Sequence, residues 1–315
     1  MKEKRLDPQI IALLEQMQEQ GVQPVETMTP TGAREVKNPV FFKLAAPAED
    51  VAGVEDLPIP GKGVEIPIRV YTPLGRGPFP IFVYFHGGGW LIGNLDTHDS
   101  VCRSLANRSG CLIVSVDYRL SPENKFPAAV EDAYAATKWV ADNAARISGD
   151  AGRLAVGGDS SGGNLATVVC LLSRENRAPS IGLQVLIYPV TDVSSLDTDS
   201  YHRHGEGYVL TRNSMRYYRD HYITNQEELR NPLVSPLLVE NLKGLPPAFI
   251  LAAEFDVLLD EVRTYAKRLE DAGVPVEFRL FKGMIHGFFC WGGVVDRAGA
   301  AVNEIASTLR SAFTS

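Results

Sequence analysis

Long apolar runs, basic clusters and paired cysteines are all missing from this sequence. No stretch approaches the roughly 20 consecutive apolar residues that a membrane-spanning helix requires, so we do not expect a membrane protein. The net charge is −7 and no local group of Lys and Arg offsets it, which argues against nucleic acid or an anionic membrane surface as a partner. The first eight residues include acidic side chains and no apolar core, so we expect no secretory signal.

The four cysteines lie far apart in the chain and form no C-x-x-C pair. Cys111 and Cys170 fall within apolar runs, which is typical of buried free thiols. A chain of 315 residues with 45% apolar residues can build a sizeable core without disulfide bonds. We therefore expect a cytoplasmic protein that consists of one large domain, or of a domain with a cap.

Alternating strand and helix patterns predict a mostly parallel sheet covered by helices on both faces. An amphipathic helix is expected first, with Asp7 as its N-cap and Pro8 at its first position. Strands are expected over 64–71, 81–85, 111–116, 153–157, 183–187, 247–251 and 276–281, and helices over 128–147, 165–172, 259–271 and a closing segment through 309.

A long insert interrupts this alternation after the strand over 183–187. A structureless loop of such length is uncommon inside a compact domain, and the tyrosines of the insert argue against disorder. Thr211 is expected to cap a helix that turns Met215, Tyr218 and Tyr222 inward. We predict that the chain divides into N-terminal cap helices, an insert that completes the cap, and a core, over residues 1–45, 190–245, and 46–189 with 246–315.

The pattern G-x-S-x-G at residues 158–162 lies between an expected strand and an expected helix. A serine on such a tight turn often has strained backbone angles, and the flanking glycines are needed because a Cβ there would collide with the neighbouring strand or helix. The turn presents the Ser160 hydroxyl above the sheet edge, and the N-terminus of the following helix favours developing negative charge. Because the pattern alone is common by chance, a nucleophilic role for Ser160 requires a base, an acid and an oxyanion site elsewhere in the chain.

The best candidate for the base is His286, just beyond the last expected strand, where α/β sheets place their functional loops. A single loop histidine is more often simply exposed, but the chain order serine, acid, histidine matches this kind of fold. The acid should follow the preceding strand. Glu254 is expected to be still within that strand, and Asp260 and Glu261 fall in a first helical turn, where the helix dipole alone favours acids. Asp256 occupies the turn itself and is the predicted acid.

Three consecutive glycines follow the strand over 81–85, in the segment His86-Gly87-Gly88-Gly89-Trp90. They permit conformations that aim successive backbone N–H groups at one point with no side chain in the way. A phosphate-binding loop would need G-x-x-x-x-G-K-[ST], which is absent, whereas H-G-G-G is the oxyanion motif of lipases and esterases. The N–H of Ser161 would complete the oxyanion hole, and His86 is expected to brace the loop.

Together these motifs resemble the hormone-sensitive-lipase-like family of α/β-hydrolase carboxylesterases. The similarity extends from His86 to Phe288 and rests on the segments 86–90, 117–123, 158–163, 245–247, 256–261, 272–274 and 286–288. It implies an α/β-hydrolase fold, with a mostly parallel central sheet, flanking helices and a helical cap. The family's pattern assigns Ser160 as nucleophile, His286 as base and Asp256 as its partner, and the N–H groups of Gly88, Gly89 and Ser161 as the oxyanion hole.

Two positions depart from the family's pattern. Ser161 stands where the family usually has alanine, although the backbone donor survives this change. The segment after Asp256 lacks the usual proline and arginine. Neither departure removes a group that the reaction uses.

The function expected from the resemblance is a serine carboxylesterase that hydrolyses small, short-acyl esters and uses no cofactor. Two alternatives stay open: a non-catalytic small-molecule receptor on the same fold, and a hydrolase of amides or acetylated sugars, because the triad chemistry is shared. The sequence also leaves open whether the protein forms a homo-oligomer.

The remaining histidines give weaker signals. His202 and His204 have the residue type of metal ligands but no third ligand nearby in the sequence, so no metal site is expected. His98 and His221 are expected on the surface or in the cap.

Overall fold

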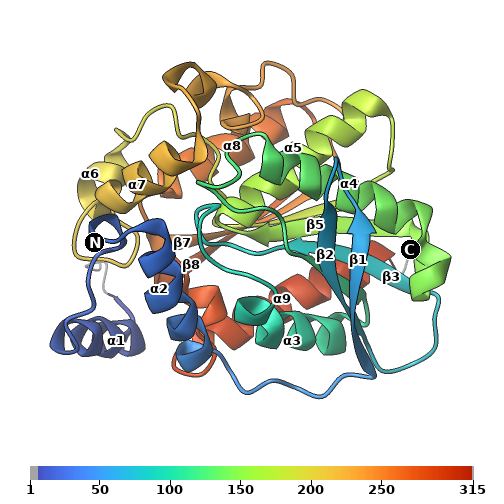
Figure 1. Ribbon diagram of the computed structural model, residues 1–315, viewed down its shortest axis with the longest axis horizontal. Coiled ribbons are helices and arrows are strands. Elements are labelled where there is room, and N and C mark those ends of the chain that lie inside the picture. The colour runs from blue at the N-terminus through green and yellow to red at the C-terminus, as the bar shows by residue number, and fades with distance from the viewer. Residues whose placement is uncertain (1–5, 314–315) are drawn as a thin grey trace.

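The computed structural model describes residues 6–313, so the predictions for residues 1–5 and 314–315 lie outside the described residues. An eight-stranded sheet with the order β1-β2-β4-β3-β5-β6-β7-β8 runs through the molecule (Figure 1). The strands are β1 (Gly53–Pro60), β2 (Glu65–Thr72), β3 (Phe79–Phe85), β4 (Leu112–Val116), β5 (Gly149–Asp159), β6 (Leu183–Ile187), β7 (Ala248–Phe255) and β8 (Val276–Ile285). The pairs β1–β2 and β2–β4 are antiparallel and all other neighbours are parallel, which confirms the mostly parallel sheet.

Helices cover both faces of the sheet (Figure 1). One layer contains α4 (Ala128–Asp142), α5 (Ser161–Asn176) and α8 (Leu259–Asp271), and the other contains α3 (Asp99–Ser109) and α9 (Asp296–Phe313). The central strand β3 shows why two layers form, because its side chains are apolar on both faces. Its residues Ile81, Val83 and Phe85 join the core under α4 and α5, whereas Phe82 and Tyr84 join the core under α3 and α9.

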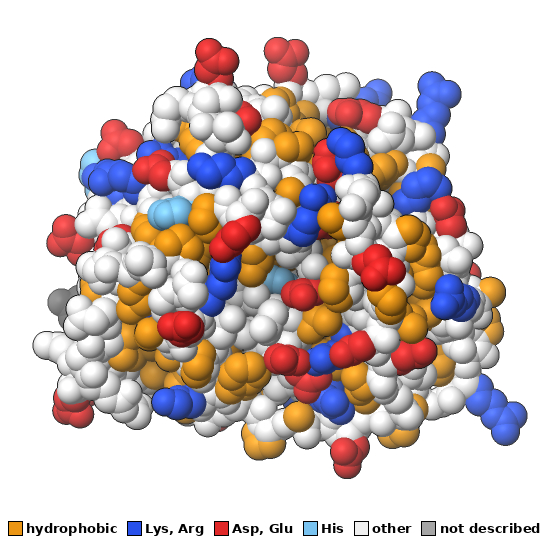
Figure 2. All heavy atoms as spheres, in the orientation of Figure 1, with side chains coloured by type: hydrophobic (Ala, Val, Ile, Leu, Met, Phe, Trp, Pro, Cys, Tyr) orange, Lys and Arg blue, Asp and Glu red, His pale blue; other side chains and the backbone are white. Residues whose placement is uncertain are grey.

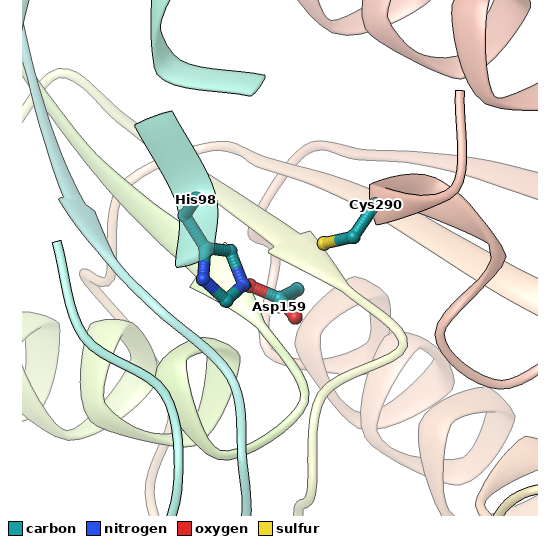
Figure 3. Close-up of side chains that lie close together, drawn as sticks. All are labelled: His98, Asp159 and Cys290. Atoms are coloured by element: carbon teal, nitrogen blue, oxygen red, sulfur yellow. The ribbon is translucent and has the colours of Figure 1, made fainter. Parts of the chain in front are cut away.

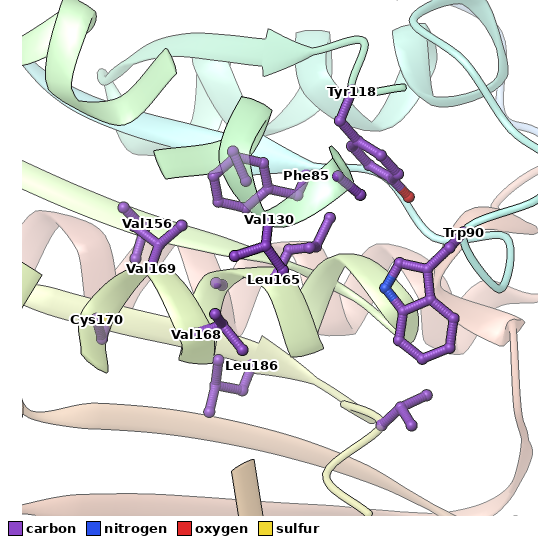
Figure 4. Packing of buried hydrophobic residues seen from close by; sticks show 14 of the residues in the cluster. Phe85, Trp90, Tyr118, Val130, Val156, Leu165, Val168, Val169, Cys170 and Leu186 are labelled. Atoms are coloured by element: carbon purple, nitrogen blue, oxygen red, sulfur yellow. The ribbon is translucent and has the colours of Figure 1, made fainter. Parts of the chain in front are cut away.

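The core beneath α5 fixes the position of that helix relative to the sheet. Figure 4 shows Leu165, Val168 and Val169 on the inner side of α5, close to Val156 of β5 and Leu186 of β6. These α5 side chains are fully buried, as their helical spacing predicts. The packing holds the N-terminus of α5 at the carboxyl end of β5, where the G-x-S-x-G turn connects the two elements.

The N-terminal segment and the insert between β6 and β7 contribute further helical elements. They are α1 (Pro8–Glu19), η1 (Val25–Thr27), α2 (Pro30–Leu44), α6 (Asp199–His204), α7 (Arg212–Tyr222), η4 (Gln226–Arg230) and η5 (Pro236–Leu238). Asp7 caps α1 by accepting a hydrogen bond from the N–H of Gln9 at 2.9 Å, as the sequence predicts. Thr211 caps α7 in the same way, and the Tyr217 hydroxyl of α7 donates to the carbonyl of Met28 at 3.0 Å. The insert and the N-terminal segment are therefore in direct contact.

The surface charges and the cysteines agree with what the composition predicts. Acidic and basic side chains are interspersed on the face seen in Figure 2, with apolar patches between them. All four cysteines are free and buried, including Cys111 and Cys170 as predicted. Within residues 6–313 no helix combines the length and the apolar character needed to cross a bilayer.

Candidate active site

Ser160 lies on the turn between β5 and α5, with φ 56° and ψ −118°. This strained backbone is possible because Gly158 and Gly162, two residues before and two after Ser160, have no side chain. A Cβ on Gly158 would lie 2.2 Å from the Phe85 carbonyl oxygen, and a Cβ on Gly162 would lie 1.9 Å from the same atom. The Ser160 N–H donates to the carbonyl of Ile187 at 2.9 Å. The turn thus holds the Ser160 hydroxyl at the carboxyl edge of the sheet, as the motif predicts.

His286 and Asp256 complete a continuous chain of hydrogen bonds with Ser160. The Ser160 Oγ lies 2.9 Å from His286 Nε2, and His286 Nδ1 lies 2.8 Å from Asp256 Oδ2. A carboxylate only accepts, so Nδ1 carries the proton and Nε2 is left to accept from the serine hydroxyl. All three side chains are buried. The structure therefore brings together the three residues that were predicted from positions far apart in the sequence.

The other acidic candidates bind elsewhere. Glu254 Oε2 accepts from the N–H of Gly283 at 2.9 Å, and Asp260 Oδ2 accepts from the N–H of Ser200 at 2.7 Å. Glu261 Oε1 accepts from the N–H groups of Thr191 and Asp192. Only Asp256 among the four contacts the imidazole of His286, because it sits directly after β7 while the others lie within the strand or on α8.

The glycine loop after β3 approaches the same point. Gly88 and Gly89 have φ values of +123° and +60°, which side chains rarely permit. A Cβ on Gly88 would lie 2.1 Å from the Ile92 carbonyl oxygen, and a Cβ on Gly89 would lie 2.3 Å from the Tyr218 ring. Neither glycine N–H donates a hydrogen bond to the part of the chain that the structure describes. Two backbone donors are thus left for a ligand in the cavity.

A cavity of about 330 Å³ joins these groups. Ser160, His286, Gly88 and Gly89 form part of its lining. The rest of its wall is mostly apolar and comes largely from the N-terminal segment and the insert, with contributions from Leu14, Met17, Val25, Phe41, Leu210 and Met215. A small, mostly apolar cavity with a few polar groups in its wall is a common form of ligand site.

Sequence reasoning missed one residue that fixes the glycine loop, Arg34 of α2. Its guanidinium donates to the Leu91 carbonyl at 2.8 Å and to the Ser121 carbonyl at 2.7 Å. It also forms a two-point ion pair with Glu123. Glu123 belongs to the family motif over 117–123, but nothing in the sequence connects that motif with an arginine of the first helices. Arg34 therefore ties α2 to the loop that carries Gly88 and Gly89.

The prediction for His98 is wrong. This residue is fully buried, and its Nε2 lies 3.2 Å from Asp159 Oδ1. By contrast His86 braces the glycine loop as predicted, with Nδ1 2.9 Å from the Gly87 carbonyl. His202 is exposed and pairs with Asp197, whereas His204 is buried against Phe255. His202 and His204 thus have different surroundings.

The buried carboxyl of Glu261 makes the stability of the fold sensitive to pH. Burial raises the pKa of Glu261 well above its ordinary value, two backbone N–H donors oppose this, and Asp192 and Asp256 add to the rise. In the unfolded chain the carboxyl titrates near pH ~4.3. Above that pH the unfolded chain loses the proton while the folded chain keeps it, so the free energy of unfolding falls as pH rises.

We expect Glu261→Gln to remove this dependence, with a difference from the wild type that grows by up to ~1.4 kcal/mol per pH unit above pH ~4.3. Urea unfolding of both proteins at several pH values measures it. Glu270→Gln, at an exposed position of the same helix, is the matched control and should follow the wild-type curve. Parallel curves for Glu261→Gln and the wild type would contradict a neutral buried carboxyl.

Known proteins are similar to this chain in sequence and in structure. A family model described as the alpha/beta hydrolase fold matches residues 82–290. The chain is 44% identical over 264 residues to the carboxylic ester hydrolase LipN of Mycobacterium tuberculosis, covering 82% of this chain and 70% of that protein. It is 35% identical over 317 residues to the ethyl acetate hydrolase of Pseudomonas putida, covering 97% and 98%. A hyperthermophilic esterase from the archaeon Pyrobaculum calidifontis has a similar structure, with a TM-score of 0.93 at 40% identity and 98% of each chain covered.

Proposed function

The chain belongs to the alpha/beta hydrolase fold family and is a carboxylic ester hydrolase, and we propose that it cleaves small, short-acyl esters through a Ser160–His286–Asp256 triad. The observation that carries this proposal is the unbroken pair of hydrogen bonds from Ser160 Oγ through the imidazole to Asp256. A serine hydroxyl is a poor nucleophile at neutral pH, and a base within hydrogen-bond reach activates it.

In the proposed acylation step, Ser160 Oγ attacks the ester carbonyl carbon while its proton passes to His286 Nε2. Asp256 holds the imidazole in the required tautomer and stabilises the imidazolium that forms. The imidazolium then gives the proton to the departing alcohol oxygen as the C–O bond breaks. A water molecule repeats the sequence on the acyl-enzyme, with His286 as base, and releases the carboxylic acid and free Ser160.

The negative charge of each tetrahedral intermediate falls on the former carbonyl oxygen. We propose that the N–H groups of Gly88, Gly89 and Ser161 receive it. The positive φ values of the glycines and their unused donors in the cavity support this role. The position of Ser161 at the first turn of α5 adds the positive end of the helix dipole.

The size of the cavity supports a small substrate. Ligand pockets commonly enclose ~300–1,000 Å³, and this cavity, at about 330 Å³, lies at the low end of that range. Its apolar wall favours short alkyl or aryl groups over sugars, whose hydroxyl groups would lose hydrogen bonds to water.

A series of chromogenic esters with increasing acyl length tests both parts of the proposal. We expect kcat/KM to be highest for short acyl groups and to fall as the acyl chain outgrows the cavity. Rapid mixing should show a burst of released chromophore for esters whose acyl-enzyme hydrolyses slowly. A rising kcat/KM with long chains would contradict the substrate class, and ligand binding without ester turnover would favour a receptor.

The glycine loop gives a separate prediction. Gly88→Ala should lower kcat by ~10²–10³-fold, the usual effect of losing an oxyanion donor, because the new methyl group cannot fit 2.1 Å from the Ile92 carbonyl oxygen without moving the loop. Gly110→Ala is the matched control, since Gly110 also has a positive φ (+70°) but no heavy atom within 4 Å of the added Cβ. It should cost about 1 kcal/mol of stability and leave kcat unchanged. Equal kcat for Gly88→Ala and the wild type would remove this loop from the mechanism.

We further propose that residues 1–45 and 190–245 form a cap over the core of residues 46–189 and 246–315. The hydrogen bond from Tyr217 to Met28 and the shared cavity wall support this division. The four free thiols fit a reducing compartment such as the cytoplasm, and fractionation of the source cells tests that location.

A further inference from the structure

Three buried side chains of different chemistry meet behind the nucleophile turn. His98 ends η2 (Asp96–His98), Asp159 ends β5, and Cys290 ends η6 (Phe288–Cys290). Their exposed fractions are 0%, 4% and 3%. Figure 3 shows the His98 imidazole and the Cys290 sulfur directed toward the Asp159 carboxylate. We propose that these three residues, the His98 cluster, bind a Zn²⁺ ion.

The donor set and its dimensions suit zinc. One imidazole nitrogen, one carboxylate oxygen and one sulfur lie within 4.8 Å of one another. A tetrahedral zinc ion with bonds of ~2.0–2.3 Å needs ligand atoms roughly 3.3–3.8 Å apart. The separation of 3.2 Å between His98 Nε2 and Asp159 Oδ1 is already close to this range, so small side-chain shifts of Cys290 complete three of the four positions.

The hydrogen bonds of His98 prepare its Nε2 as a ligand. The Thr97 hydroxyl oxygen lies 2.8 Å from the Asn94 carbonyl oxygen and 2.9 Å from His98 Nδ1. When Nε2 coordinates zinc, Nδ1 carries the ring proton and donates it to this hydroxyl, which in turn donates to the Asn94 carbonyl. Zinc-bound histidines have the same arrangement, with the distal N–H donated to an oxygen.

Nε2 makes no hydrogen bond within the described residues and is fully buried. A packed structural pair would use only the imidazole and the carboxylate, and the adjacent thiol would serve only to fill space. Zinc accounts for all three side chains at once, because Nε2 and a carboxylate oxygen can coordinate it and the thiol gives its proton to solvent as the Zn–S bond forms.

A metal ion can reach the cluster through the catalytic cavity. Asp159 and Cys290 both line that cavity, so the fourth coordination position faces it and suits a water molecule. Asp159 Oδ1 also accepts from the N–H of Gly87 at 2.9 Å and from the Tyr84 hydroxyl at 2.7 Å. Zinc competes with these two donors for the carboxylate. Its binding therefore shifts the glycine loop and Asp159 itself, which directly precedes Ser160. Zinc therefore inhibits ester hydrolysis, a consequence that rests on the proposed function, whereas binding itself does not.

Titration of the full chain with Cd²⁺, after dialysis against a chelator, tests the binding. Cd²⁺ bonded to a thiolate gives an ultraviolet charge-transfer band that reports the Cys290 sulfur without reference to activity. We expect the band to saturate at one Cd²⁺ per chain and to be displaced by Zn²⁺. His98→Gln should weaken binding at least ~10-fold. Cys290→Ser should abolish the band, whereas Cys170→Ser, at a buried thiol of α5, should retain it.

The wild-type protein provides a second measurement that depends on no variant. Zn²⁺ should raise the unfolding temperature in a concentration-dependent way, because it binds the folded chain, and Mg²⁺, which prefers oxygen ligands, should not. A band that persists in Cys290→Ser, or no saturable band and no zinc-dependent shift in the wild type, would overturn the site. Zinc binding without inhibition would overturn only its coupling to hydrolysis.

Discussion

Replacing Ser160 with alanine is expected to lower kcat for ester hydrolysis by at least ~10⁴-fold. The substitution removes the oxygen that forms the acyl-enzyme, and the cavity and glycine loop alone then provide only the residual rate of a bound, polarised ester. His286→Ala should have a similar effect, because a hydroxyl without a base within reach stays protonated and weakly nucleophilic. Steady-state kinetics with a short-acyl chromogenic ester measures both losses.

The double variant Ser160→Ala/His286→Ala separates a triad from two independent contributions. Residues that act as a unit have non-additive effects, so the double variant should lose little more than either single variant. Ser173→Ala is a suitable control, since Ser173 is a buried serine of α5, the helix that follows Ser160, and its hydroxyl has no hydrogen-bond partner among the described residues. Its turnover should match that of the wild type. Wild-type turnover in Ser160→Ala would show that another nucleophile carries the reaction.

The elements that form the site were the most predictable part of the fold. The apolar run of β3, the inward stripe of α5 and the helix α8 all have strong local patterns, and α8 begins and ends where it was predicted. Such segments are buried on one or both faces, so the burial that stabilises them is visible in their own residues.

The sequence gives no such pattern for β1 and α2, whose bounds were not predicted. The edge strand β1 contains two prolines, Pro58 and Pro60, and is largely exposed, while α2 contains Pro39 and few buried residues. Their positions depend on contacts with distant parts of the chain, such as the pairing of β1 with β2. A sequence pattern shows how much of a segment's own surface is buried, and β1 and α2 bury few of their residues.

The buried polar residues near the site also differ in how well the sequence predicts them. Chain order and the turn after β7 predicted Asp256, and the geometry brings it to His286. The burial of His98 was not predictable, because its partners Asp159 and Cys290 are contributed by elements far along the chain. A histidine in a loop has no periodic neighbours that would show whether it is exposed or enclosed. Only the three-dimensional arrangement identifies it as part of a buried cluster.

Asp256→Asn is expected to lower kcat by ~10⁴-fold while leaving the fold intact. The carbonyl oxygen of the substituted side chain can still accept from the N–H of Leu258, as Asp256 Oδ1 does at 3.0 Å, so the turn after β7 should persist. The amide group, however, can donate to His286 Nδ1, which favours the tautomer with its proton on Nε2. That nitrogen then faces Ser160 with a proton in place of a lone pair and cannot act as a base.

The matched control is Asp260→Asn, which alters a nearby carboxylate that binds the N–H of Ser200 and not the imidazole. Its kcat should stay within a few-fold of the wild type, and thermal unfolding of both variants should show that neither has lost its fold. The predicted split is therefore a large fall in kcat with little change in stability for position 256, and little change in kcat for position 260. The reverse pattern would move the role of the acid from the turn after β7 to the first turn of α8, and would require the imidazole of His286 to rotate away from Asp256 during the reaction.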